Sequence, residues 1–177
     1  TDVAGARALY PLACATGAIC DAGAGEALMH GLRALQDRGQ FTTTLAEVRT
    51  AAVSAVAVRH LAREPVRRMA LFGCGAQARS HLRAIAAESP SLQEVRVWSP
   101  QADRSAFVRE LSAELTVTIV ASETAETAAT GADLHVLVTS SPLRVLDRRC
   151  VSDGARVVSV GACRPDHREM DPDLVSA

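Results

Sequence analysis

Three small residues with the spacing of a dinucleotide-binding loop stand in the segment Gly73-Cys-Gly-Ala-Gln-Ala78. An apolar run, residues 69–72, leads directly into this segment, and a helical pattern follows it without a spacer. Gly73 permits a sharp turn, Gly75 lets the backbone approach a pyrophosphate without a Cβ in the way, and Ala78 permits close packing of helix on strand. The N-terminus of the helix offers unpaired N–H donors and a partial positive charge to the anion. The cofactor-binding residues predicted in this loop are Gly73, Gly75, Ala76 and Gln77.

The residues after the second predicted strand bear on the choice of nicotinamide cofactor. An NAD site usually places an acidic residue at the end of this strand, where it contacts the ribose 2′-hydroxyl. Here the strand ends at Trp98-Ser99-Pro100, and the nearest acid, Asp103, lies beyond the turn. Ser99 and Arg104 can instead meet a 2′-phosphate. We therefore favour NADP(H) over NAD(H).

Three hydroxyl residues, Thr139, Ser140 and Ser141, close the fourth predicted strand. At the carboxyl end of a strand beside the first one, hydroxyl groups can meet the ribose or the nicotinamide of a dinucleotide. A plain turn from strand to loop is the alternative. We predict that these three residues contact the cofactor.

Strands and helices alternate after Pro65, which is the pattern of βαβ units. Right-handed crossovers then predict a Rossmann-like, doubly wound α/β fold, whose parallel sheet has the order 3-2-1-4-5. We expect a dinucleotide-binding domain over residues 65–177, preceded by a helical N-terminal segment over residues 1–64. Residues 41–44, Phe-Thr-Thr-Thr, can be extended or can cap the helix that follows them. Strands are predicted at residues 66–72, 95–99, 116–120, 134–139 and 155–160, and helices at residues 26–38, 45–61, 76–88, 102–114 and 124–130.

Composition excludes several classes of function. The chain has 177 residues, is 48% hydrophobic and carries a net charge of −1, which favours one domain with a small appendage and gives no electrostatic case for nucleic acid or membrane. It shows no apolar run of membrane-spanning length and no signal peptide at its start. Its five cysteines are odd in number and lack Cys-x-x-Cys spacing, so we expect free thiols and a cytoplasmic protein.

Four motifs, in order over residues 45–175, resemble the ornithine cyclodeaminase/mu-crystallin family. They are Arg49-Thr-Ala-Ala-Val-Ser54, the glycine segment at residues 73–78, Thr139-Ser-Ser-Pro142, and Val160-Gly-Ala-Cys-Arg-Pro-Asp-His-Arg-Glu-Met-Asp171. The resemblance implies binding of NAD(H) or NADP(H). It also implies oxidation of an amino acid, cyclisation of ornithine with loss of ammonia, or reduction of an imine, and mu-crystallin types bind thyroid hormone as well.

The resemblance also implies roles for three residues. Arg49 matches the arginine that holds the substrate carboxylate, for which a guanidinium fork has the right geometry; an exposed helix arginine is the alternative. Thr50 matches a neighbour that reaches toward the cofactor phosphates. Cys163 stands where cyclodeaminases carry an aspartate that works on the substrate amine and mu-crystallin types carry a serine. We take Cys163 as the candidate catalytic residue, lining the cavity rather than acting as a nucleophile.

The acidic and histidine residues near Cys163 do not predict a metal site. His167, Glu169 and Asp171 alternate as metal ligands might, but no other spacing in the chain supports such a site. We therefore predict no metal.

The chain departs from the family in its substrate half. The family builds a mixed sheet before the helix that carries Arg49, whereas residues 1–44 read as helical and alanine-rich, and the family also continues beyond the last motif. The catalytic lysine of the family lies in that half, and this chain contains no lysine. Two functions remain open. One is an NAD(P)-dependent oxidoreductase acting on a small amino acid or imine, and the other is a non-catalytic NADP-binding relic or accessory subunit. In either case we expect a homodimer or a partner protein that completes the pocket.

Overall fold

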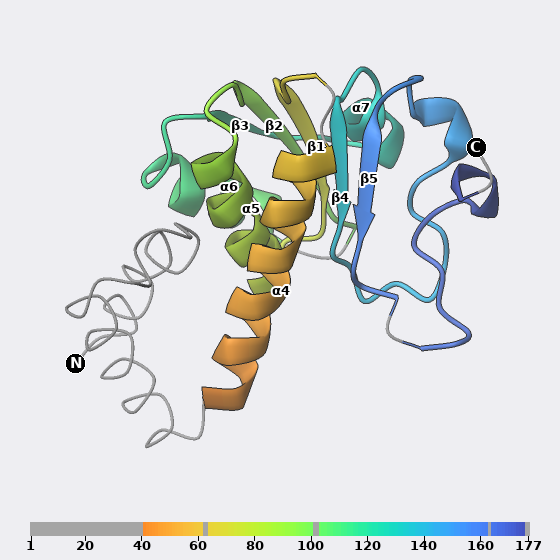
Figure 1. The fold of residues 1–177 in the computed structure, drawn as a ribbon, viewed down its shortest axis with the longest axis horizontal. Helices are drawn as coiled ribbons and strands as arrows, with labels where there is room; N and C mark the ends of the chain where they lie inside the picture. The colour runs from red at the N-terminus through yellow and green to blue at the C-terminus, as the bar shows by residue number, and fades with distance from the viewer. Residues whose placement is uncertain (1–40, 62–63, 101–102, 163, 176–177) are drawn as a thin grey trace.

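A five-stranded, all-parallel sheet forms the centre of the computed structural model, which describes residues 41–61, 64–100, 103–162 and 164–175 (Figure 1). The strand order is β3-β2-β1-β4-β5. β1 therefore pairs with β2 on one side and with β4 on the other, which is the reversal point of a doubly wound sheet. The predicted fold class and strand order are confirmed. The strands are β1 (Arg68–Phe72), β2 (Glu94–Trp98), β3 (Thr118–Ala121), β4 (Leu134–Leu137) and β5 (Arg156–Ser159).

Helices cover both faces of the sheet because side chains along β1 alternate between two apolar clusters. Met69 and Leu71 belong to the cluster that also contains core residues of α4 (Phe41–Leu61), α5 (Ala76–Glu88) and α6 (Arg104–Ser112). Ala70 and Phe72 belong to the second cluster, which α7 (Ala125–Ala129) and the C-terminal segment cover. This alternation is the period-two pattern of a strand buried on both faces. Two short 3₁₀ helices, η2 (Arg148–Cys150) and η3 (Pro172–Leu174), lie in the C-terminal segment.

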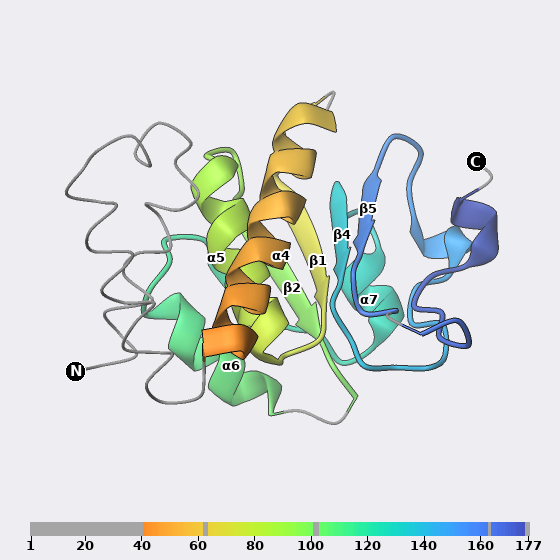
Figure 2. The same cartoon turned by 60° about the horizontal axis from the view of Figure 1, so that its bottom comes forward.

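α4 lies beside α5 and extends past one edge of the sheet (Figures 1 and 2). Its first turns project beyond the edge at which β5 ends, and its last residue, Leu61, accepts a 3.4 Å hydrogen bond from Arg156 at the start of β5. Ala51, Ala55 and Val58 bury one side of α4 in the same core as the sheet. Residues 41–44 belong to the helix itself, so neither the extended segment nor the cap expected from the sequence is observed.

Both C-terminal strands end earlier than predicted, and one carboxylate explains this. β4 was expected to reach residue 139 and β5 residue 160, but they end at Leu137 and Ser159. The N–H groups of Thr139 and Gly161 donate to the carboxylate of Glu169 instead of to a neighbouring strand. Side-chain hydrogen bonds of this kind compete with the sheet ladder and end it.

Hydrogen bonds to side chains also determine where β1 and α6 begin. The first strand begins at Arg68 rather than at residue 66, because Asp133 Oδ2 accepts the N–H groups of both Arg67 and Arg68. α6 begins at Arg104 rather than at residue 102, because Asp103 caps the helix by accepting from Ala106 N at 3.0 Å. α4 begins four residues earlier than predicted, and the other predicted strands and helices within the described residues differ from the observed ones by no more than two residues at either end.

Some predictions fall outside what the structure tests. The helix predicted at residues 26–38 lies outside the described residues, and so does Cys163. The division of the chain at residue 65 stays a prediction. Within the described part, no helix combines the length and apolar character needed to span a membrane.

Candidate functional site

The carboxyl ends of the strands bring most of the predicted cofactor residues to one edge of the sheet. The glycine loop follows β1, Ser99 follows β2, and Thr139 follows β4 by two residues. Because all five strands are parallel, these ends meet at the same edge, and β1 and β4 are adjacent there. This is the reversal point at which open α/β sheets bind ligands.

Gly73 and Gly75, the two glycines of the loop, differ in backbone conformation and in the space around them. Gly73 has a φ of 115°, and a Cβ at this position would lie 2.8 Å from the carbonyl oxygen of Val138. The fold itself therefore requires glycine at residue 73. Gly75 has a φ of −79°, which any residue adopts, and a Cβ there would meet no described heavy atom within 4 Å. The space in front of Gly75 is open, which fits the close approach of a pyrophosphate.

The N-terminus of α5 presents backbone donors to this open space. Gly75 is the N-cap residue and has no side chain to satisfy the first N–H groups of the helix. Ala76 is exposed, Gln77 is half-buried, and the first turn contains no acidic residue. Unpaired donors and the helix dipole together favour an anion at this position.

Cys74, in the middle of the glycine loop, adds no negative charge to the loop at neutral pH. Its thiol is buried, and burial raises the pKa of Cys74 above its usual value. The guanidinium groups of Arg79 and Arg104 act in the opposite direction but do not reverse the shift. The thiol therefore stays neutral at neutral pH, and no thiolate repels a phosphate from the loop.

Ser99 and Arg104 lie together at the end of β2. The Arg104 guanidinium donates a 3.2 Å hydrogen bond to the Ser99 carbonyl oxygen and lies 3.9 Å from the carboxylate of Glu123. Asp103 caps α6 through its Oδ1, which accepts from Ala106 N. A basic group, Arg104, therefore stands beside the residue that follows this strand.

The three hydroxyl residues after β4 differ in what their side chains bind. The Thr139 hydroxyl donates to Glu169 and accepts from Ser141 N, and the Ser141 hydroxyl donates to Leu143 O at 2.8 Å. Ser140 is exposed. The loop is thus braced by Thr139 and Ser141, while Ser140 presents its side chain to solvent.

Glu169 has a structural role at the edge where β4 and β5 end, and sequence reasoning missed this role. It is 1% exposed, and its carboxylate accepts four hydrogen bonds. Oε1 accepts from the N–H and hydroxyl of Thr139, both at 2.6 Å. Oε2 accepts from the Ser159 hydroxyl at 3.0 Å and from Gly161 N at 2.7 Å. Four donors compensate the burial of the carboxylate and join the ends of β4 and β5.

α4 is connected to the glycine loop through a buried histidine. Burial lowers the pKa of His81, so its ring is neutral at neutral pH. Its Nδ1 lies 2.8 Å from the Gln77 carbonyl oxygen, so Nδ1 carries the proton and donates, and Nε2 can accept from the Ser54 hydroxyl at 3.0 Å. Ser54 lies one turn after Thr50 on α4 and is 3.1 Å from its carbonyl oxygen. Thr50 is half-buried and Arg49 is exposed on the same helix.

Two acidic residues of the last motif, Glu169 and Asp171, are engaged in protein contacts. Asp171 Oδ2 accepts a 2.7 Å hydrogen bond from Arg144, and the Glu169 carboxylate is bound as described above. His167 is half-buried. Within the ranges that the structure describes, no group of three or more His, Cys, Asp or Glu residues is arranged to hold a metal ion.

Comparison with known proteins places the chain in one family. The model of the ornithine cyclodeaminase/mu-crystallin family matches residues 13–177, so the match begins well before the motifs recognised in the sequence. The ketimine reductase mu-crystallin of Rattus norvegicus is 36% identical over 128 residues, which are 72% of this chain and 39% of that protein. The ornithine cyclodeaminase of Agrobacterium fabrum is 31% identical over 136 residues, which are 75% of this chain and 38% of that protein.

Solved structures agree with this relationship. The Δ(1)-pyrroline-2-carboxylate reductase of Thermococcus litoralis, in complex with NADH and L-proline, superposes with a TM-score of 0.70 at 29% identity, over 75% of this chain and 41% of that one. The iminosuccinate reductase of Paracoccus denitrificans, in complex with NAD⁺, gives a TM-score of 0.69 at 28% identity, over 75% of this chain and 41% of that one. The chain spans about two fifths of the length of the curated relatives it matches. From the family match over most of its length, the chain belongs to the ornithine cyclodeaminase/mu-crystallin family.

Proposed function

We propose that the chain is the cofactor-binding part of an NAD(P)-dependent oxidoreductase that acts on a small amino acid or an imine. The observation that carries this proposal is the glycine loop at the reversal point, with open space in front of Gly75 and an uncapped helix N-terminus behind it. The relatives support it, because they include a ketimine reductase, an iminosuccinate reductase and an ornithine cyclodeaminase.

The residues at the edge where the parallel strands end, called the carboxyl edge of the sheet, would hold the cofactor. The N–H groups at Gly75, Ala76 and Gln77 would bind its pyrophosphate, because they are donors at a helix N-terminus. Ser140, exposed after β4, can reach its ribose or nicotinamide side. When bound, the cofactor supplies or accepts the hydride of the reaction.

NADP(H) is the form that we propose, although the reductases of Thermococcus litoralis and Paracoccus denitrificans were solved with NADH and NAD⁺. The support is local. Arg104 stands beside Ser99 at the end of β2, and the carboxylate of Asp103 is turned to the N-terminus of α6. A guanidinium at this position favours a 2′-phosphate over a free 2′-hydroxyl.

Arg49 is the proposed substrate-binding residue. It is an exposed arginine on α4, whose first turns project past the carboxyl edge of the sheet. A guanidinium can bind a carboxylate through two parallel hydrogen bonds, which orients the substrate as well as attracting it. Cys163, which follows β5, stays a proposed lining residue of the reacting end. A second copy of the chain or a partner protein would complete the pocket around Arg49.

Turnover by the purified protein tests this function. The absorbance of the reduced nicotinamide is followed with NADPH or NADP⁺ against a panel of amino acids, and of keto acids with ammonia or amines. Arg49→Ala is compared with Arg59→Ala, which removes another exposed arginine of α4. Turnover that survives Arg59→Ala and is lost in Arg49→Ala supports the enzyme. Cofactor binding without turnover across the panel would leave the alternative, a non-catalytic NADP-binding accessory chain.

A further inference from the structure

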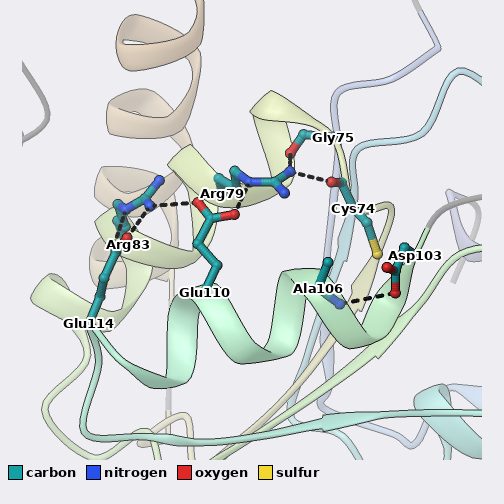
Figure 3. Close-up of polar contacts among 8 residues, drawn as sticks. All are labelled: Cys74, Gly75, Arg79, Arg83, Asp103, Ala106, Glu110 and Glu114. Atoms are coloured by element: carbon teal, nitrogen blue, oxygen red, sulfur yellow. Dashed lines mark hydrogen bonds and ion pairs between the residues drawn. The ribbon is translucent and has the colours of Figure 1, made fainter. Parts of the chain in front are cut away.

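The side chain of Arg79 lies directly behind the glycine loop. Its Nη1 donates to the carbonyl oxygen of Cys74 at 2.5 Å and to that of Gly75 at 3.2 Å (Figure 3). Both acceptors belong to the peptide units that lead into the N-terminus of α5. One guanidinium therefore binds two consecutive carbonyl groups of the loop.

The orientation of these carbonyl groups determines where the neighbouring N–H groups point. In a trans peptide unit the C=O of one residue and the N–H of the next point in opposite directions. Because the carbonyl oxygens of Cys74 and Gly75 face Arg79, the N–H groups of Gly75 and Ala76 face away from it. These two N–H groups belong to the donors proposed for the pyrophosphate.

We infer that Arg79 is a positioning residue, which orients the first backbone donors of the glycine loop toward the pyrophosphate of the cofactor. This inference rests on the proposed cofactor function. Arg79 acts through the loop carbonyl groups and does not itself need to touch the ligand.

α6 holds Arg79 in place. The carboxylate of Glu110 accepts from Arg79 Nε at 2.9 Å, and the guanidinium carbon lies 5.1 Å from the centre of the Phe107 ring. Phe107 is fully buried and is one turn from Glu110 on the same helix. Contact with a carboxylate on one side and an aromatic face on the other restricts the side chain, so the two loop hydrogen bonds do not depend on a mobile arginine.

Arg83 offers a matched control. It lies one turn after Arg79 on α5 and also binds α6, with Nε 2.7 Å from Glu114 Oε2 and Nη2 3.4 Å from Glu110 Oε1. In Figure 3 its guanidinium points toward Glu114, away from Cys74 and Gly75. Replacing Arg83 therefore weakens the contact between α5 and α6 without removing a hydrogen bond to the loop.

The experiment compares Arg79→Met and Arg83→Met in the full chain. Calorimetric titration with NADPH measures affinity, and thermal unfolding measures the loss of the α5–α6 contact in each variant. We expect Arg79→Met to lower the affinity about tenfold and Arg83→Met to change it less than about twofold. Arg79→Lys should recover part of the affinity, because an ammonium can still donate to the loop carbonyls.

A second measurement does not depend on the ligand. We expect the NMR amide resonances of Gly75 and Ala76 to shift in Arg79→Met and to stay in place in Arg83→Met. Equal loss of NADPH affinity in the two methionine variants would overturn the inference, and so would unmoved Gly75 and Ala76 resonances in Arg79→Met. A wild-type chain that binds neither NADPH nor NADH would contradict the proposed function, and the resonances would then decide the role of Arg79 alone.

Discussion

The N–H of Gly161 donates a 2.7 Å hydrogen bond to Glu169 Oε2, and a Cβ at residue 161 would overlap Glu169 Oε1 and the carbonyl oxygen of Thr139. The buried carboxylate can therefore occupy its position only because residue 161 is glycine. Through Thr139 and Gly161, Glu169 joins the ends of β4 and β5. It braces the side of the carboxyl edge next to the glycine loop.

Replacing Glu169 with glutamine should destabilise the fold. An amide can accept hydrogen bonds only at its oxygen, so its NH₂ group must face the donors of either Thr139 or Gly161. Leaving a buried donor without an acceptor costs about 1–3 kcal/mol. Urea denaturation of Glu169→Gln measures this loss against Asp166→Asn, which changes an exposed carboxylate of the same segment. Equal stability of the two variants would contradict the bracing role.

The two loop glycines should respond differently to alanine. At residue 73 alanine must adopt a φ of 115° and meets the Val138 carbonyl oxygen at 2.8 Å, so we expect Gly73→Ala to lose about 1–3 kcal/mol or more. At residue 75 alanine meets open space at an ordinary φ, so we expect Gly75→Ala to stay within about 1 kcal/mol of wild type. Chemical denaturation of both variants checks this difference. A Gly75→Ala loss as large as that of Gly73→Ala would count against the observed loop.

Stability should fall in mild acid because of His135. Its ring is fully buried, neither ring nitrogen has a hydrogen-bond partner among the described residues, and burial lowers its pKa from 6.5 to about 4. Below pH 6.5 the unfolded chain takes up a proton that the folded chain takes up only near pH 4. The free energy of unfolding should therefore decrease as pH falls through this window, by about 2 kcal/mol between pH 7.5 and pH 5.

Urea denaturation at the two pH values tests the origin of this loss. His135→Leu removes the buried ring and should lose correspondingly less stability on acidification, whereas His60→Gln, which removes an exposed histidine, should behave as wild type. His81 acts in the same direction, because burial lowers its pKa too, so some pH dependence should remain. An undiminished loss in His135→Leu would refute the assignment.

Local patterns were sufficient to predict the sheet. Apolar runs bounded by turn residues identified all five strands, and the strand order typical of doubly wound dinucleotide-binding folds then predicted the order that the structure confirms. The glycine loop was predictable because its requirements are local, a sharp turn at Gly73 followed at once by a helix. The ends of helices and strands were less predictable, because side chains distant in sequence accept hydrogen bonds from the backbone N–H groups at those ends. Asp133, which accepts from the N–H of Arg67 before β1, is an example.

Residues that act across the fold could not be found in the sequence. Glu169 stood out only as part of the alternating set His167, Glu169 and Asp171, since nothing in the chain indicates that donors at Thr139 and Gly161 converge on it. Arg79 and Glu110 are 31 residues apart, and their pairing depends on how α5 and α6 pack. The roles of Arg49, Ser99 and Cys163 stay predictions that binding and turnover must test.

Calorimetric titration of the wild-type chain with NADPH and with NADH, beside Gly75→Val and Gly154→Ala, tests most directly whether the chain binds a nicotinamide dinucleotide at the glycine loop. Gly75→Val fills the open space in front of the loop. Gly154→Ala strains a glycine with a φ of 81° in the turn before β5, at the opposite edge of the sheet, so it controls for a loss of stability that arises away from the loop. We expect saturable binding to the wild type and to Gly154→Ala, tighter for NADPH than for NADH, and a loss of at least about tenfold in affinity for a folded Gly75→Val. No binding of either nucleotide to the wild type, or equal binding by Gly75→Val, would contradict the proposed cofactor site.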